Sequence, residues 1–144
     1  MENRETLKKL DKGVFVVNLL AVIYDPKNKK FLIVRRENDP YFEELTWCFP
    51  GARPEYGKKL GTEIKRIIKE KVGYNIEILG EIFSKVYPEK QEFLSIYYLC
   101  EITGGEEKLS DDFKESKWVE AKELEENFTT SFHPRLKQYL LDLV

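Results

Sequence analysis

The amino-acid sequence predicts one domain of the α/β (α+β) class, spanning residues 1–144 and built on a mixed β-sheet. The chain length of 144 residues suits a single domain, because domains cluster at about 100–150 residues. Several apolar runs have the length of β-strands, and one long stretch with helical periodicity lies between the third and the fourth of them. This order favours mixed α and β structure over a helical bundle or a β-sandwich.

Three strands are predicted in the first third of the chain. Gly13 to Tyr24 is an apolar run typical of a strand that is buried on both faces. The Asp-Pro-Lys-Asn sequence at 25–28 is a turn signal, so Lys30 to Arg36 is expected to return as the second strand of a hairpin. Polar residues 37–44 indicate a loop, and Leu45 to Phe49 is predicted to be a short strand.

A helix is predicted over Leu60 to Val72. Its apolar residues recur at i, i+4, i+7, i+8 and i+12, a spacing that places them on one helix face. Gly73 follows in the position of a C-terminal cap. After the helix, two long strands are expected at 76–86 and 93–102. An acidic loop at 106–115, a short strand at 117–119 and two helices at 121–126 and 134–143 are expected to follow.

Composition and charge argue against several classes of function. The 24 basic and 26 acidic residues give a formal net charge of −2, whereas a nucleic-acid-binding domain usually has a strongly basic face. The N-terminus lacks the apolar core of a signal peptide, and the apolar run from Val14 is too short to cross a membrane. We therefore expect a soluble cytoplasmic protein without nucleic-acid or membrane partners, in which Cys48 and Cys100 are buried thiols.

The segment from Trp47 to Lys58, together with the helix and Gly73, resembles the Nudix box. The family pattern is Gly, five residues, Glu, seven residues, Arg-Glu, an apolar residue, any residue, Glu-Glu, any residue and Gly. Leu32 to Arg36 and Trp118 to Leu124 also resemble segments of that fold. The resemblance implies a Nudix-type (MutT-like) α/β/α sandwich with a mixed β-sheet over residues 13–143. The named positions of the box are occupied here by Ala52, Lys58, Arg66, Ile67, Glu70, Lys71 and Gly73.

The helix of that box has lost most of its acids in this chain. Carboxylates at i, i+3 and i+4 share one helix face and can hold Mg²⁺ through oxygen ligands, and the metal can then activate a water molecule. The three positions are Ile67, Glu70 and Lys71 here. One glutamate is insufficient for a cluster of two or three metal ions, so we expect one weak magnesium site or none.

A partial resemblance to the GDP-mannose mannosyl hydrolase branch of the superfamily suggests how a single ion would bind. That branch has Pro-Gly-Gly-Arg at the start of its box, which resembles Gly51-Ala52-Arg53 here. Carried over to this chain, the resemblance implies metal ligands at the Gly51 carbonyl, Glu70 and Asp112. Two residues depart from the branch: Lys71 replaces the glutamate it retains, and Phe113 replaces its general base, a histidine.

Two hypotheses about function follow from this resemblance. The first is a Nudix-family hydrolase of a small-molecule nucleoside diphosphate derivative, such as a nucleotide sugar, with at most one Mg²⁺. The second is a non-catalytic protein that binds a nucleotide or phosphate ligand in the same pocket. Neither the general base nor the oligomeric state is determined by the sequence, and a homodimer is left open. The catalytic candidates are Glu70, Asp112 and Arg66, and the substrate-binding candidates are Arg36, Arg53, Arg66, Lys71 and Trp47.

Several of these residues also have a purely structural interpretation. Ile67 extends the apolar face of the helix. Glu70 is either a metal ligand or a solvated acid paired with Lys69 or Arg66. Glu63 is either a displaced metal ligand or a surface acid. Lys71 either replaces the missing metal ion or pairs with Glu63 or Glu70. The only histidine, His133, either caps the last helix or is a relocated base.

Overall fold

The computed structural model describes residues 13–40 and 42–144, and the N-terminal residues on which the signal-peptide expectation rests lie outside them. Strands β1 (Val16–Asp25), β2 (Lys30–Arg35) and β3 (Trp47–Cys48) follow one another in the first part of the chain. The β1–β2 hairpin closes as predicted at its turn, with Tyr24 paired to Phe31. The third strand is shorter than the predicted 45–49, and it is followed by a strand that the sequence did not predict, β4 (Gly51–Ala52).

Helix α2 (Leu60–Val72) has the bounds that the apolar spacing predicted. Gly73 ends the helix in a left-handed conformation with φ of 96°, and its N–H donates to the Ile68 and Lys69 carbonyls. A side chain at this position would meet the Glu106 carbonyl oxygen at 2.1 Å. Glycine is therefore required both by the backbone angle and by the close passage of the next loop.

Two long strands follow α2, and they are joined more tightly than predicted. Strand β5 (Tyr74–Tyr87) and strand β6 (Lys90–Gly105) pair along their length, and Tyr87 is already paired to Lys90. The expected six-residue loop at 87–92 is thus a two-residue connection. The chain ends with β7 (Glu115–Val119), a short 3-10 helix η1 (Ala121–Glu123), α3 (Leu124–Asn127) and α4 (Pro134–Leu143).

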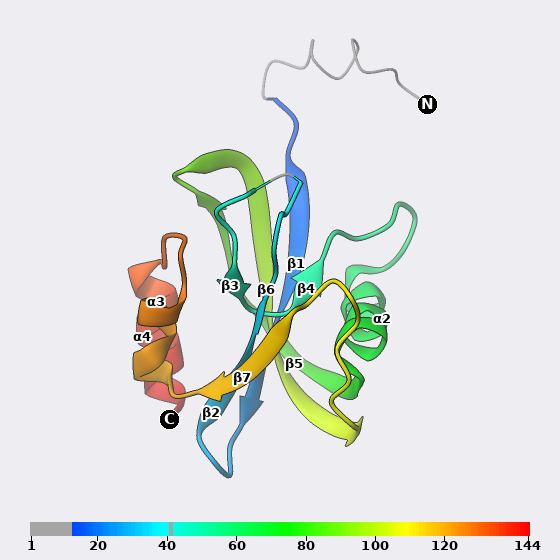
Figure 1. Ribbon diagram of the computed structural model, residues 1–144, viewed down its shortest axis with the longest axis vertical. Helices are drawn as coiled ribbons and strands as arrows, with labels where there is room; N and C mark the ends of the chain where they lie inside the picture. The colour runs from blue at the N-terminus through cyan, green and yellow to red at the C-terminus, as the bar shows by residue number, and fades with distance from the viewer. Residues whose placement is uncertain (1–12, 41) are drawn as a thin grey trace.

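The strands form one seven-stranded mixed sheet with the central order β3-β2-β1-β6-β5, in which β4 pairs with β1 and β7 with β2. β1 and β6 are parallel, and the other pairs are antiparallel. Figure 1 shows α2 on one side of the strands and α3 with α4 on the other. The predicted α+β sandwich is confirmed. No helix within residues 13–40 and 42–144 is long and apolar enough to cross a membrane.

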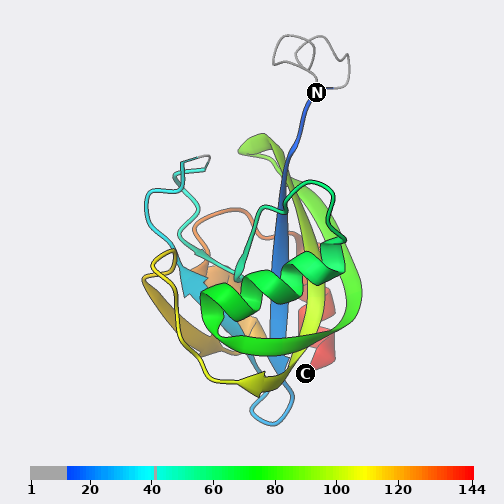
Figure 2. The same ribbon diagram turned by 90° about the vertical axis from the view of Figure 1, so that its right-hand side faces the viewer.

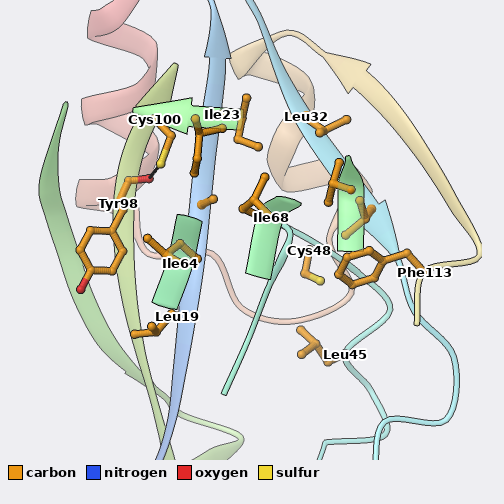
Figure 3. Close-up of a cluster of buried hydrophobic side chains, with 14 of the residues drawn as sticks. Leu19, Ile23, Leu32, Leu45, Cys48, Ile64, Ile68, Tyr98, Cys100 and Phe113 are labelled. Carbon is orange, nitrogen blue, oxygen red and sulfur yellow. Dashed lines mark hydrogen bonds between the residues drawn. The ribbon is translucent and has the colours of Figure 1, made fainter. Parts of the chain in front are cut away.

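Each helical layer covers its own hydrophobic cluster. Ile64 and Ile68 of α2 pack with Leu19, Ile23 and Cys100 on one side of the sheet (Figure 3). Leu136 and Leu140 of α4 pack with residues of β1 and β2 on the other side. Both cysteines are buried and free, as expected. The turned view shows α2 lying across the strands, with the loop before β7 passing beside its C-terminal end (Figure 2).

Candidate functional site

A polar cleft lies where β2, β4, the C-terminal end of α2 and the loop before β7 meet. Its volume is about 250 Å³, and it is lined by residues 36–40, 51–53 and 111–114 together with Lys71. The cleft therefore collects Arg36, Arg53, Lys71 and Asp112 among the residues that the sequence singled out. A larger cleft of about 700 Å³, which includes Tyr74 and Trp118, contains none of the predicted site residues.

Arg36 forms a fixed wall of this cleft, because its side chain is only 12% exposed. Its Nη2 donates to the Gly51 carbonyl oxygen at 2.9 Å, and its Nη1 donates to Asp39 at 3.1 Å. The guanidinium also lies over the Phe113 ring, 5.5 Å from the ring centre. Asp39 was not predicted to belong to the site. Its position three residues after a strand-end arginine, in an Asn-Asp-Pro turn, is the signal that could have indicated it.

Lys71 projects into the cleft from the last turn of α2 and forms an ion pair with Asp112. The alternative that Lys71 pairs with Glu63 or Glu70 is therefore wrong. Asp112 lies on the loop before β7, whose Ser110 N–H donates to the Lys71 carbonyl oxygen at 2.9 Å and so holds the loop against the helix end. The hydrogen bond from Lys71 lowers the pKa of Asp112 below its ordinary value.

Arg66 forms ion pairs with acidic residues of α2 that do not line the cleft. Its Nη2 lies 2.7 Å from Glu63 and its Nη1 lies 2.8 Å from Glu70, while Glu55 is 3.9 Å away. The pairing of Glu70 with Arg66 was one of the alternatives and is confirmed. Glu63 is not the expected surface acid, since its side chain is only 3% exposed. The hydrogen bond from Arg66 lowers the pKa of Glu63.

Two further candidates lie outside the residues that line the cleft. Trp47 on β3 packs against the α3–α4 side of the sheet, and Lys117 Nζ lies 4.5 Å from its ring centre. His133 caps α4, because its Nδ1 accepts a hydrogen bond of 3.1 Å from the Arg135 N–H. The capping interpretation of His133 is therefore confirmed. Trp47 as a contact to substrate stays a prediction.

The three predicted magnesium ligands do not fit a metal ion as they are arranged. The Gly51 carbonyl accepts from Arg36, Glu70 is held by Arg66, and Asp112 is held by Lys71. Each predicted ligand group thus already has a side-chain cation within hydrogen-bond distance of one of its oxygens. Within the described part of the chain, no three His, Cys, Asp or Glu side chains are grouped so that they could hold a metal ion.

These features define a mixed-sheet α/β sandwich with a cleft lined by cations and acids at the Pro-Gly-Ala-Arg turn. A family model described as the NUDIX domain matches residues 14–141. The chain belongs to this family, which confirms the resemblance seen in the sequence.

Individual proteins are similar to this chain in sequence or in fold. An ADP-ribose pyrophosphatase of Methanocaldococcus jannaschii is 30% identical over 101 residues, which are 68% of this chain and 59% of that protein. The chain therefore spans less than two thirds of the length of this curated relative. Two solved structures share the fold, a NUDIX hydrolase from Nitrosomonas europaea and a MutT protein from Methanosarcina mazei. The first has a TM-score of 0.69 and 17% identity, and its alignment covers 88% of this chain and 70% of that one. The second has a TM-score of 0.65 and 22% identity, and its alignment covers 90% of this chain and 92% of that one.

Proposed function

We propose that this chain is a Nudix hydrolase of a nucleoside diphosphate derivative, with nucleotide sugars as the first substrates to test. Family membership supports this assignment. So does the similarity to proteins described as an ADP-ribose pyrophosphatase and a UDP-X diphosphatase, the latter a solved structure with a TM-score of 0.60 and 14% identity. Both descriptions name enzymes that act on diphosphates of nucleosides. We expect no more than one weak magnesium site, because each predicted ligand group has a side-chain cation beside it that opposes the binding of an ion.

The observation that carries the proposal is the convergence of basic side chains from separate elements on one cleft. Arg36 directly follows β2, Arg53 directly follows β4 and Lys71 lies in α2, and all three line the same space beside Gly51. The lining also contains a fourth cation, Lys114, and four acids, Glu37, Asp39, Asp111 and Asp112. Pockets for whole drug-sized ligands measure about 300–1,000 Å³, and this cleft measures about 250 Å³. We therefore assign the diphosphate to the cleft and the nucleoside to the surface outside it.

The same cations have a part in the hydrolytic step. When water attacks a phosphorus of the diphosphate derivative, a new O–P bond forms and the bond from that phosphorus to the bridging or ester oxygen breaks. The water gives its proton to a base, and the leaving group takes the negative charge. Fixed cations stabilise such charge best in a site where they need not reorganise. We assign proton acceptance from water to Asp112, whose carboxylate lines the cleft. Glu70 and Arg66 do not line the cleft, so the proposal gives them a structural role.

A second function, binding without catalysis, is favoured by a specific observation. Arg66 forms ion pairs with Glu63 and Glu70, and Lys71 forms one with Asp112. A carboxylate in an ion pair is a weaker base than a free one, because the cation stabilises its charged form. If ligand binding leaves these pairs intact, the chain holds the diphosphate without cleaving it.

One experiment separates the two functions. The full chain is incubated with a panel of nucleoside diphosphate derivatives, with ADP-ribose and UDP-sugars first, in the presence and absence of Mg²⁺. Turnover is followed by chromatography of the products, and binding is followed by calorimetry. Product formation supports the hydrolase, and binding without product supports the second function. Absence of both for every compound in the panel would overturn the two proposals together.

Arg53→Ala is expected to weaken binding of a nucleoside diphosphate by about 1.5–3 kcal/mol, the scale of a hydrogen bond to a charged group. Arg53 directly follows β4 and lines the cleft. In the proposed site, removal of its guanidinium therefore removes a direct contact to phosphate. Arg135, which lies in the first turn of α4 and outside the cleft lining, provides the control as Arg135→Ala. Equal losses in the two variants would mean that general charge attraction, and not a contact from Arg53, accounts for anion binding.

A further inference from the structure

We propose that the cleft binds its diphosphate ligand in the metal-free form, with Lys71, Arg36 and Arg53 in place of magnesium. This inference rests on the proposed function, and it specifies the form of the ligand that the site recognises. Its basis is the disagreement between the predicted metal ligands and what they contact. The Gly51 carbonyl, the Glu70 carboxylate and the Asp112 carboxylate each have one oxygen bonded to a side-chain cation.

Arg36 opposes metal binding at the turn. The Gly51 oxygen accepts from Arg36 Nη2 at 2.9 Å, so one of its two lone pairs is used and a positive charge lies beside any ion that the other would coordinate. The guanidinium is also held by Asp39 and packed on Phe113, and it is largely buried. Its positive charge is therefore a permanent feature of the cleft wall, at the point where an ion would otherwise contribute its charge.

Lys71 supplies a second charge that is able to reach a ligand. An ammonium group has three N–H donors, and one oxygen of Asp112 accepts from Lys71 among the described residues. The lysine side chain is 25% exposed at the cleft, and Asp112 is 61% exposed. A phosphate oxygen can therefore bind a remaining donor of the ammonium group. The Lys71–Asp112 pair also keeps the ammonium at the cleft in the absence of ligand.

Arg66 removes the helix acids from competition for an ion. Arg66 Nη1 lies 2.8 Å from Glu70, while its Nε and Nη2 bind the buried Glu63. Because Glu63 holds the guanidinium beside Glu70, its positive charge opposes the binding of a magnesium ion there. The protein therefore provides few oxygen ligands for magnesium, whereas the free diphosphate provides several. Magnesium bound to the ligand reduces the charge that Lys71 and the arginines attract.

The test is calorimetric titration of the full chain with ADP and with ADP-ribose, each in EDTA and each in excess Mg²⁺. We expect binding in EDTA that is at least as tight as binding in Mg²⁺. In EDTA, Lys71→Met is expected to weaken binding by about tenfold or more, the scale of one charged hydrogen bond. Lys71→Arg is expected to retain most of the affinity, because it keeps the charge.

Lys69→Met is the matched control, since Lys69 lies in the same last turn of α2 but donates to the Gly73 carbonyl outside the cleft lining. It should leave the affinity unchanged. Binding that requires Mg²⁺ would overturn the metal-free site. Equal losses of affinity for Lys71→Met and Lys69→Met would overturn it as well. Either result would leave the proposed function intact. Absence of binding to either compound in both buffers would instead reject the diphosphate ligand itself, and this inference with it.

Discussion

Replacement of Gly51 by alanine is expected to destabilise the fold by about 3 kcal/mol or more, in the upper range for single substitutions. Gly51 is paired with Leu20 across the β1–β4 contact. A Cβ atom at this position would lie 1.8 Å from the Leu19 carbonyl oxygen. The atoms that the new Cβ would meet belong to the main chain of β1, so they cannot move aside as the end of a flexible side chain could. The free energy of unfolding, measured in urea, is the readout.

Gly80→Ala provides the matched control for this prediction. Gly80 also lies in a strand, β5, and a Cβ there would meet no atom within 4 Å. Its substitution is expected to change stability by less than about 1 kcal/mol. Because Gly51 also lines the cleft and binds Arg36, the alanine variant should lose ligand affinity even where it remains folded. Equal unfolding free energies for the two variants would contradict the close approach of β4 to β1.

The second large effect is expected from restoring acids to α2. In the double variant Ile67→Glu with Lys71→Glu, carboxylates at 67, 70 and 71 share one helix face, the arrangement that holds Mg²⁺. Loss of the ammonium also frees Asp112. We expect Mg²⁺ affinity to rise about tenfold or more and hydrolysis of a nucleoside diphosphate derivative to increase with it. Binding of the metal-free ligand should fall, because the cleft loses a cation and gains an anion.

Two single variants identify the source of any gain. Ile67→Glu alone should do little for metal binding, since Lys71 would neutralise the new acid one turn away. It should also lower stability by about 1–3 kcal/mol, because Ile67 is 1% exposed. Lys71→Gln alone should lose affinity for the metal-free ligand without gaining magnesium. If the double variant folds but gains neither metal binding nor turnover, the helix is not the missing part, and binding without catalysis becomes the better proposal.

Local sequence patterns predicted much of the fold. The bounds of α2 follow from apolar spacing and from Gly73, both of which act within a few residues. The β1–β2 hairpin follows from a turn signal between two apolar runs. The two-residue strand β4 has no such pattern, because its existence depends on β1 passing beside it. The two-residue connection between β5 and β6 was also missed, since pairing continues through polar residues that alone indicate a loop.

For the site, the sequence determined which chemical groups are available, and the tertiary structure decided which of them meet. The loss of acids at Ile67 and Lys71 is visible in the sequence. The pairing of Arg66 with Glu63 and Glu70 follows from helical spacing of three and four residues. Lys71 and Asp112 are 41 residues apart, and Arg36 and Gly51 are 15 apart. These contacts exist only because β2, β4 and the loop before β7 end beside the same helix terminus, and no local periodicity encodes that arrangement.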